Sequence, residues 1–387
     1  MSNPPTHLKS DGRPRARLPQ LGHVNGCENS VHYHVGSIDL FSCADYRLQS
    51  LKRVLLYVVY YSTNIMGVTV ANITAPYAGD VGKDKGQKKV WTTLITNTNY
   101  LSGLLTLEYS LRKHKSRYPL VALYTESFPS EGHEALKRRG IAAKEIPYLL
   151  PSVSKEYIND PRFYDCWSKL APYSLTEYDR VVQLDSDMLL LQNMDELMDL
   201  ELDSPEMSGE GDRVYAASHA CACNPFHKPH YPAHWVPENC AFTSQHGRPD
   251  LAQTEGAPAT AGISCPNGGL QVCNPSEGTY NKIVEALNNG DLTSSYDFAD
   301  QSLLGERFHG RWVTLPYVYN ALKTMRIKGV HDAIWRDDQI KNIHYILSPK
   351  PWDETLESTT NDTHKWWLEV NNERLSLEQS EGIRDGF

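Results

Sequence analysis

The sequence predicts an α/β fold, a single domain with a mainly parallel central sheet that is flanked by helices. The first supporting observation is that apolar runs of strand length alternate with helical segments between residues 91 and 187. The second is that one such run, residues 180–184, ends directly before two carboxylates, Asp185 and Asp187. The third is the length of 387 residues, which is enough for one large domain with extensions.

The expected elements follow the hydrophobic pattern along the chain. On the helix after the first strand, Leu101, Leu104, Leu105 and Leu111 form one apolar stripe. Alternation of strands and helices predicts parallel strands joined by right-handed crossovers. In chain order we expect strand 91–96, helix 100–114, strand 120–124, helix 131–139, strand 143–146, helix 164–175, strand 180–184, helix 194–200 and strands 214–218, 269–273 and 312–315.

Three regions are expected along the chain. Residues 1–88 are predicted to be a poorly ordered extension with an apolar segment, because Pro, Gly, Asn and His are scattered through its first half. Residues 89–355 form the predicted α/β domain, with an irregular insertion rich in Cys, His and Pro at 219–263. Residues 356–387 form a C-terminal extension that is expected to be helical.

The charge of the chain argues against a nucleic-acid partner. The formal net charge is −9. Residues 1–90 contain 11 Lys and Arg against 6 Asp and Glu, a net of +5, which leaves −14 for the remainder. The predicted domain therefore has no broad basic excess with which to neutralise a phosphate backbone.

The cellular location is predicted from the apolar segment and the cysteines. Lys52 and Arg53 precede a moderately apolar stretch at 54–73, an arrangement that a signal anchor in a secretory-pathway membrane would have. Polar residues interrupt that stretch, so its uninterrupted part is too short to span a bilayer. The 8 cysteines, without a clear secretory signal, favour reduced thiols. We therefore expect a cytoplasmic protein, with the membrane anchor as the alternative.

Asp185 and Asp187 are the first candidate site residues. In open α/β sheets, ligands bind beyond the carboxyl ends of the strands, which is where both aspartates are expected. A divalent cation between the aspartates and a diphosphate would remove the repulsion between these anionic groups. Taken alone, such a pair of aspartates is more often a turn or a helix cap.

Further candidates stand in short motifs downstream. His344 ends an apolar run and offers an imidazole to the same cation, and Lys350 offers an ammonium to a phosphate. Asn267 and Gly268 belong to a Pro-Asn-Gly-Gly segment, in which glycine lets the backbone approach a ligand. Each motif also has a structural explanation, as an edge-strand histidine, a solvated lysine or an Asn-Gly turn.

The stretch at 296–304 has the pattern of a helix start. Asp297 is expected to cap this helix, and Asp300 and Gln301 are expected in its first turn. An aspartate at that position is often only a favourable charge at the helix end.

In this order, the motifs resemble those of glycosyltransferase family 8, the glycogenin and galactinol synthase group. The resemblance spans roughly residues 89–353 and implies a catalytic domain of the GT-A type, a Rossmann-like fold that binds nucleotide-diphospho-sugars. It identifies Asp185-Ser186-Asp187 as the metal motif, with Mn²⁺ or Mg²⁺ as the ion and His344 as a further ligand. It implies that the UDP-sugar is bound by Leu94, Thr96, Asn97, Tyr100, Arg162, Asp185, Ser186, Asn267, Gly268, Asp297 and Lys350, and that Lys169, Asp300 and Gln301 are catalytic.

Two departures from the family pattern stand out. Leu347 occupies a position where the family normally has glycine, close to the diphosphate. Phe298 and Ala299 replace two small residues between the aspartates of the donor-sugar stretch. The metal motif itself is intact, so the resemblance favours an active enzyme.

The resemblance implies a Mn²⁺-dependent retaining hexosyltransferase that uses UDP-glucose or UDP-galactose. The expected acceptor is a small polyol, as for galactinol synthase, a saccharide, or the protein itself, as for glycogenin. A homodimer is considered as well. The alternative function is a non-catalytic sensor or scaffold that binds a sugar nucleotide. In that case Leu347 and Phe298 would indicate that catalytic activity has been lost.

The insertion at 219–263 contains a separate set of candidate ligands. A zinc site is one interpretation, but the spacing matches no standard zinc finger, and free thiols or a loop disulfide are the alternatives. The surrounding Pro and aromatic residues suit a loop on the acceptor side. The candidate zinc ligands are Cys221, Cys223, His227, His230, His234 and Cys240.

Overall fold

The computed structural model describes residues 86–387, which contain one sheet of seven strands and one of three. The strands of the large sheet are β1 (Lys89–Ile95), β2 (Leu120–Tyr124), β3 (Ala142–Glu145), β4 (Arg180–Leu184), β6 (Tyr215–Ala217), β7 (Leu270–Cys273) and β8 (Val313–Thr314). Their order is β3-β2-β1-β4-β7-β6-β8. Neighbouring strands are parallel, except that β7 is antiparallel to β4 and β6. The predicted fold class, α/β with a mainly parallel sheet, is confirmed.

The central strands of this sheet are buried on both faces. All 5 residues of β4 are buried, and Val181 and Val182 contribute to two different hydrophobic cores. Successive side chains of a strand point to opposite faces, and both faces are covered here, so even Arg180 and Gln183 of this strand are buried beside its three apolar residues. One core contains Trp167 and the other contains Trp91.

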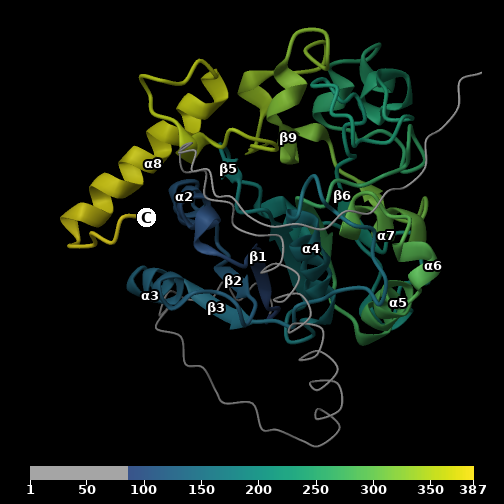
Figure 1. Cartoon of the computed structure of the whole chain (residues 1–387), viewed down its shortest axis with the longest axis horizontal. Helices are drawn as coiled ribbons and strands as arrows, with labels where there is room; N and C mark the ends of the chain where they lie inside the picture. Colours follow the sequence, from purple (N-terminus) through teal and green to yellow (C-terminus); the bar gives the residue numbers. More distant parts are fainter. Residues whose placement is uncertain (1–85) are drawn as a thin grey trace, which may run out of the picture. The chain divides into compact units, whose positions relative to one another are not determined.

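Helices cover the two faces of the large sheet (Figure 1). In the described part of the chain, the α-helices are α2 (Leu101–Lys113), α3 (Ser130–Arg138), α4 (Arg162–Cys166), α5 (Glu277–Leu287), α6 (Gly290–Thr293), α7 (Ala299–Arg307) and α8 (Asp362–Ser380). α2 and α3 pack into the core that contains Trp91, whereas α5 and α7 pack into the core that contains Trp167. The predicted leucine stripe of α2 is buried.

The helix expected at 164–175 has a different form. α4 ends at Cys166 and continues as the 3₁₀ helix η2 (Trp167–Ser174), which contains Pro172. Proline has no backbone N–H and its ring crowds the preceding turn, so a regular α-helix does not continue through it. The segment expected at 194–200 is likewise a 3₁₀ helix, η3 (Asp195–Asp199). The expectation of regular helices was wrong at both places, although the segments are helical.

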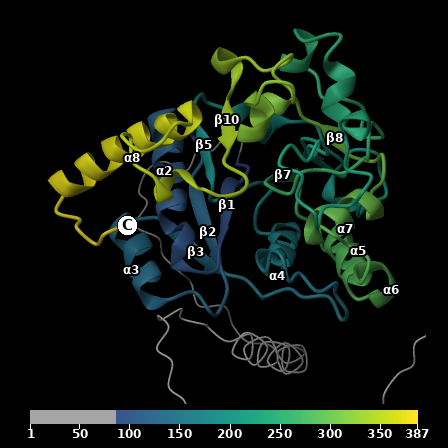
Figure 2. The same cartoon turned by 45° about the horizontal axis from the view of Figure 1, so that its top comes forward.

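The small sheet was not predicted, and it positions the site. It joins β5 (Met188–Leu190), β10 (Asn342–His344) and β9 (Ala321–Leu322) in the order β5-β10-β9. β10 is antiparallel to β5 and places His344 opposite Met188, the residue after Asp187. Figure 2 shows β5 and β10 side by side. Strand pairing therefore brings two motifs together that are far apart in the sequence.

α8 occupies most of the C-terminal extension and lies beside α2 in both views (Figures 1 and 2). The guanidinium of Arg139 contacts Glu378 of α8 and Asp385 beyond it, each at 2.7 Å. The three side chains are largely buried, and charge-assisted bidentate contacts of this kind are strong. They hold the C-terminal end of the chain on the domain.

A helix that crosses a membrane needs about 20 mostly apolar residues. Within residues 86–387, no helix meets the length and apolarity that crossing requires. The apolar stretch at 54–73 lies outside the described residues, as does all but the end of the extension expected at 1–88. The cytoplasmic location and its membrane-anchored alternative therefore stay predictions.

Candidate active site

The carboxyl end of β4 borders a cavity of about 240 Å³, in the position where α/β sheets bind ligands. Most of the predicted site residues line this cavity, but Gly268 and Asp297 do not. The predicted residues that line it are Leu94, Thr96, Asn97, Tyr100, Arg162, Lys169, Asp185, Ser186, Asp187, Asn267, Asp300, Gln301, His344 and Lys350.

His344 and the two aspartates form a compact cluster in the cavity wall. Nε2 of His344 lies 3.2 Å from Oδ1 of Asp187 and 3.6 Å from Oδ2 of Asp185. One ligand atom from each residue lies within 4.8 Å of the other two. The backbone N–H of Tyr345 donates to the carbonyl of Asp187 at 2.9 Å and continues the pairing of β10 with β5. The structure thus brings the three predicted metal ligands together.

The ring of His344 is oriented by Asn320, a residue that the sequence analysis did not identify. Nδ1 of His344 donates to Oδ1 of Asn320 at 2.9 Å, and Nδ2 of Asn320 donates to Oδ1 of Asn267 at 2.9 Å. The backbone N–H of Gly269 also donates to Oδ1 of Asn267, at 3.0 Å. With its proton on Nδ1, a neutral imidazole presents the lone pair of Nε2 to the aspartates. This is the orientation that a metal ligand requires.

Two lysines, the buried Lys350 and the partly buried Lys169, neutralise the aspartates. Nζ of Lys350 pairs with Asp187 and donates to the carbonyl of Tyr345 at 2.7 Å, and Nζ of Lys169 lies 2.6 Å from Oδ1 of Asp185. Burial raises the pKa of Asp187, but the charge of Lys350 outweighs burial and holds this pKa well below its usual range. Burial lowers the pKa of Lys169, but Asp185 outweighs it and keeps the pKa above its usual value. The negative charges are therefore balanced on both sides.

Asp300 and Gln301 lie in the first turn of α7, as expected. Burial raises the pKa of Asp300 to about 7, although the nearby Lys169 opposes the shift. Nε2 of Gln271 donates to Oδ2 of Asp300 at 3.1 Å. Oε1 of Gln301 accepts from the backbone N–H of Gly268 at 2.8 Å. The hydrogen bond from Gly268 thus fixes the orientation of the Gln301 amide group. The amide nitrogen of Gln301 can then donate a hydrogen bond to a ligand in the cavity.

Asp297 does not take the position expected for it. The N-cap of α7 is Phe298, with no side-chain cap bond. The carboxylate of Asp297 instead pairs with Lys155, outside the cavity lining. The predicted cap is wrong, because an opposite charge nearby attracts the carboxylate. The position of Asp297 also gives no support to the predicted contact with the donor sugar.

Polar side chains gather where β1 ends. Oγ1 of Thr96 donates to Oδ2 of Asp165 at 2.9 Å, and Nδ2 of Asn97 donates to Oγ1 of Thr96 at 3.1 Å. The hydroxyl of Tyr100 accepts from Nη1 of Arg162 at 2.7 Å. Ligand sites commonly combine an apolar lining with a few placed polar groups of this kind.

Two backbone positions restrict the space around His344. A Cβ atom added to Gly269 would overlap Cε1 of His344 and would lie 3.0 Å from Oδ1 of Asn267. Leu347, at the position where the family pattern has glycine, has a φ angle of +63°. This left-handed conformation is unfavourable for residues with a Cβ atom. The backbone therefore keeps a conformation suited to glycine although the residue is leucine.

An aromatic cluster forms another part of the cavity wall. The rings of Phe298 and Trp235 are stacked, with centroids 4.2 Å apart. Tyr231 and Phe163 contact Phe298 edge-on, with centroid distances of 5.3 and 5.5 Å. All four side chains line the cavity, and Trp235 and Tyr231 belong to the insertion. Phe298, which departs from the family pattern, is thus packed by aromatic residues in the cavity wall.

The chemistry of the cluster suits a divalent cation. Asp185, Asp187 and His344 supply carboxylate oxygens and one imidazole nitrogen, a mixed set that fits Mn²⁺ better than Ca²⁺. When Nδ1 of His344 donates to Asn320, the lone pair of Nε2 faces the carboxylates. The residues present therefore fit the ion that the sequence motif implies.

The fold and the site together define a class of protein. An α/β domain with a candidate cation cluster and a cavity at a strand end is the arrangement of an enzyme that binds a small ligand beside a metal ion. The profile of Glycosyl transferase family 8 matches residues 92–356. The chain therefore belongs to glycosyltransferase family 8, and the predicted family and enzyme class, a hexosyltransferase, are confirmed.

Among known proteins, the chain is similar to plant galactinol synthases. It is 27% identical to galactinol synthase 1 of Ajuga reptans over 318 residues, which cover 77% of this chain and 86% of that protein. It is 29% identical to galactinol synthase 1 of Solanum lycopersicum over 295 residues, which cover 73% and 82% of the two chains. Among solved structures, the galactosyltransferase LgtC in complex with donor and acceptor sugar analogs matches with a TM-score of 0.45 at 16% identity, covering 73% of this chain and 96% of that one.

Proposed function

We propose that this protein is a Mn²⁺-dependent, retaining hexosyltransferase that moves galactose or glucose from a UDP-sugar to a small polyol. The observation that carries the proposal is the convergence of Asp185, Asp187 and His344 beside the cavity. A divalent ion is what allows two carboxylates to bind a diphosphate. The similarity to galactinol synthases favours galactose and a polyol acceptor.

The diphosphate is proposed to bind at the metal cluster. Asp185, Asp187 and His344 would hold the ion, which would stabilise the negative charge that develops on the departing UDP. Lys350 and Lys169 place ammonium groups at the same end of the cavity. Their positive charge would strengthen binding of the phosphate oxygens through charge-assisted hydrogen bonds.

The uridine is proposed to bind where β1 ends. Thr96, Asn97, Tyr100 and Arg162 supply polar groups there, and all four line the cavity. Ser186, Asn267 and the apolar Leu94 complete this part of the proposed donor site. Ser186 and Leu94 are joined by a hydrogen bond of 3.0 Å from the hydroxyl of Ser186 to the carbonyl of Leu94.

The donor sugar is proposed to lie against Asp300 and Gln301. The amide nitrogen of Gln301 would donate to a sugar hydroxyl, because its oxygen already accepts from Gly268. Asp300, whose pKa is raised to about 7 by burial, would orient sugar hydroxyls and stabilise positive charge at the anomeric carbon. Retention requires that the acceptor adds to the face of the sugar that the diphosphate leaves.

The acceptor is proposed to approach along the insertion. Phe226, Tyr231 and Trp235 of the insertion line the cavity and give that wall a large apolar area. Apolar walls with few polar groups suit a small ligand that is oriented by a limited number of hydrogen bonds. A small polyol fits this description better than a long chain that would need an open groove.

A screen of donors and acceptors tests the proposed function. Purified protein is incubated with UDP-galactose, UDP-glucose and other UDP-sugars, with or without Mn²⁺ and polyols such as inositol, and UDP release is measured. We expect release that depends on Mn²⁺, increases with a polyol and is abolished in Asp187→Asn. The matched control is Asp291→Asn, which removes an exposed carboxylate of α6 and should leave turnover unchanged.

The possible results of this screen separate the competing functions. Wild-type turnover in Asp187→Asn would rule out the metal assignment. Binding of UDP-sugars without any turnover would indicate the non-catalytic sensor. Intact-mass analysis after incubation with UDP-glucose and Mn²⁺ would detect added hexose if the protein glucosylates itself. The homodimer stays a separate prediction, to be tested by the molar mass in solution.

A further inference from the structure

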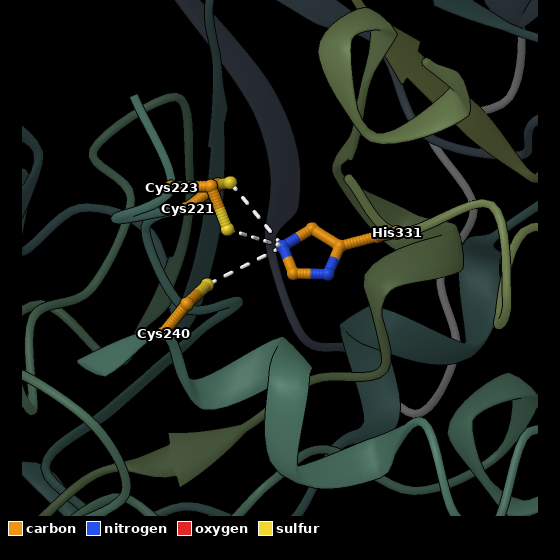
Figure 3. Close-up of side chains that lie close together, drawn as sticks. All are labelled: Cys221, Cys223, Cys240 and His331. Carbon is orange, nitrogen blue, oxygen red and sulfur yellow. Dashed lines mark hydrogen bonds between the residues drawn. The ribbon is translucent and has the colours of Figure 1, made fainter. Parts of the chain in front are cut away.

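Three cysteines of the insertion and one distant histidine form a second cluster. The Sγ atoms of Cys221, Cys223 and Cys240 lie 3.4, 3.2 and 3.4 Å from Nε2 of His331. Figure 3 shows all three sulfur atoms directed at this one ring nitrogen. The four ligand atoms lie within 4.8 Å of one another. His331 is 91 residues away from Cys240 in the sequence, so no local motif contains the complete set.

The distances in this cluster fit one tetrahedral ion. For a Zn–S length of about 2.3 Å and a Zn–N length of about 2.0 Å, a tetrahedron has sulfur–nitrogen edges of about 3.5 Å. The observed separations of 3.2 to 3.4 Å are close to this value. The exposed fractions of Cys223, Cys240 and His331 are 8%, 3% and 0%. Cys221 is partly exposed and lines the cavity, so three of the four ligands are buried and the set has room for a single ion.

The imidazole of His331 is held in place by His246 and Phe242. Nδ1 of His331 lies 2.9 Å from Nε2 of His246. The ring of Phe242 packs edge-on against that of His331, with centroids 5.5 Å apart. Histidines that bind a metal usually donate their other ring N–H to a neighbouring group. A proton on Nδ1 leaves the lone pair of Nε2 directed at the three sulfur atoms.

We propose that Cys221, Cys223, Cys240 and His331 bind one structural Zn²⁺ ion. A Cys₃His set is among the standard ligand sets of structural zinc, and four protein ligands leave no open position for a substrate. On binding, the three thiols become thiolates and their protons pass to solvent. Thiolates favour zinc, whereas the oxygen-rich cluster of the active site favours Mn²⁺.

This assignment changes the zinc ligands expected from the sequence. His227, His230 and His234 lie near the cysteines in the sequence but contribute no atom to the cluster. The fourth ligand comes instead from the segment between β9 and β10. The cysteines of the cluster are free thiols, so they form no disulfide that would compete with metal binding.

The zinc ion would connect two segments that both reach the active-site cavity. Asn224, Pro225 and Phe226 directly follow Cys223 and line the cavity, and Thr324 lines it from the segment that contains the histidine. The insertion contains only short 3₁₀ helices. Most of its backbone hydrogen bonds join residues a few positions apart within the insertion, so a metal cross-link to His331 would fix this cavity wall against the rest of the domain. The proposed zinc ion would thus fix the position of the cavity wall that the insertion forms, and it would not contact the substrates.

The metal content of the wild-type protein tests the proposal directly. Full-length protein is prepared without chelators or metal-affinity resins, and its metals are measured by elemental analysis and native mass spectrometry. We expect one zinc ion per chain and, after exchange with Co²⁺, the visible absorption of tetrahedral cobalt with a thiolate charge-transfer band. Folded protein without zinc, iron in place of zinc, or a disulfide within the cluster would overturn the proposal.

Variants identify which residues bind the ion. His331→Ala and Cys240→Ser are expected to lose the zinc, whereas His234→Ala and Cys265→Ser, matched controls outside the cluster, should retain it. Loss of zinc in His234→Ala with retention in His331→Ala would contradict the ligand assignment.

A labelling experiment on the wild-type protein does not depend on how the variants fold. Cys221, Cys223 and Cys240 should resist alkylation until a chelator removes the zinc, and should then become labelled. Labelling that is equally fast with and without chelator would contradict the proposal. Neither experiment needs a sugar donor or an acceptor. A negative result for zinc therefore does not contradict the proposed transferase activity, and an absence of transferase activity does not contradict the zinc site.

Discussion

Oδ1 of Asn320 lies 2.9 Å from Nδ1 of His344, and this hydrogen bond determines which imidazole nitrogen faces the aspartates. Nδ2 of Asn320 donates to Asn267, so its oxygen is the atom that accepts the proton of Nδ1. His344 therefore presents Nε2 at 3.2 Å from Asp187. The metal cluster depends on an asparagine that does not itself belong to it.

Replacing Asn320 is expected to weaken metal binding without removing a ligand. Asn320→Ala should lower the apparent affinity for Mn²⁺ by about 10- to 100-fold, because the ring of His344 loses its orienting partner. Asn320→Asp keeps an acceptor for Nδ1 and should stay closer to the wild type. Calorimetric titration with Mn²⁺ measures the effect, and Asn372→Ala, an exposed position on α8, is the control. Equal affinities in all four proteins would show that Asn320 does not position His344.

Adding a methyl group at Gly269 is expected to displace His344. In Gly269→Ala the new Cβ would overlap the imidazole and crowd Oδ1 of Asn267. We expect Mn²⁺ affinity to fall about tenfold or more, and overpacking to lower the free energy of unfolding by about 1–3 kcal/mol. Gly247→Ala is the control, because no atom lies within 4 Å of its added Cβ. Unchanged Mn²⁺ affinity in Gly269→Ala would mean that the ring can move aside freely.

Because the backbone at Leu347 is left-handed, we expect the glycine variant at this position to be more stable than the alanine variant, the reverse of the usual order. At an ordinary position alanine is more stable than glycine by about 0.5–1 kcal/mol. At a φ angle of +63°, the Cβ atom costs about 1–2 kcal/mol. Leu347→Gly should therefore unfold at a higher temperature than Leu347→Ala, although both lose the same side-chain contacts. Calorimetry of the two variants measures this difference, and the usual order would show that the position carries no strain.

The buried carboxyl of Asp300 predicts a pH dependence of stability. Its pKa is about 7 in the folded protein and about 4 in the unfolded chain. The folded state therefore binds more protons in this window, and Asp300 lowers stability as the pH rises from about 4 to about 7. Asn cannot ionise, so the stability of Asp300→Asn relative to the wild type should increase by about 2–3 kcal/mol between about pH 5 and about pH 8.

Urea unfolding at both pH values, without added Mn²⁺, measures this change. The exposed Asp291→Asn serves as the control and should show the same difference from the wild type at each pH. A constant difference for Asp300→Asn would mean that Asp300 is already ionised at the lower pH.

The regular elements and the metal motif were predictable because their signals are local. The strand expected at 120–124 has those bounds in the structure, and the leucine stripe at 100–114 became the buried face of α2. Asp185 and Asp187 could be placed at a strand end because the segment before them has the length of a strand and contains the apolar residues Val181, Val182 and Leu184. The helix expected at 164–175 differs in type because Pro172 lies inside it, and a regular α-helix does not continue through proline.

Side chains whose role depends on a residue far away in the sequence could not be predicted from local sequence patterns. Asn320 stands between apolar residues in a short strand connection, and nothing in its neighbourhood indicates His344. His331 is 108 residues away from Cys223 and lies outside the cysteine-rich insertion. Sequence proximity therefore points to His227, His230 and His234 as zinc ligands and gives no signal for His331, which completes the cluster.

By itself, the sequence determined the α/β class, the order of the elements and the residue types that can bind a cation or a phosphate. These properties depend on hydrophobic periodicity and on short motifs, which act over a few residues. Only the tertiary structure decided which of those residues meet. The antiparallel pairing of β10 with β5 placed His344 beside Asp187, and packing of the insertion against the segment before β10 placed His331 beside three cysteines. Contacts between distant segments depend on how whole elements pack, and sequence spacing does not record that packing.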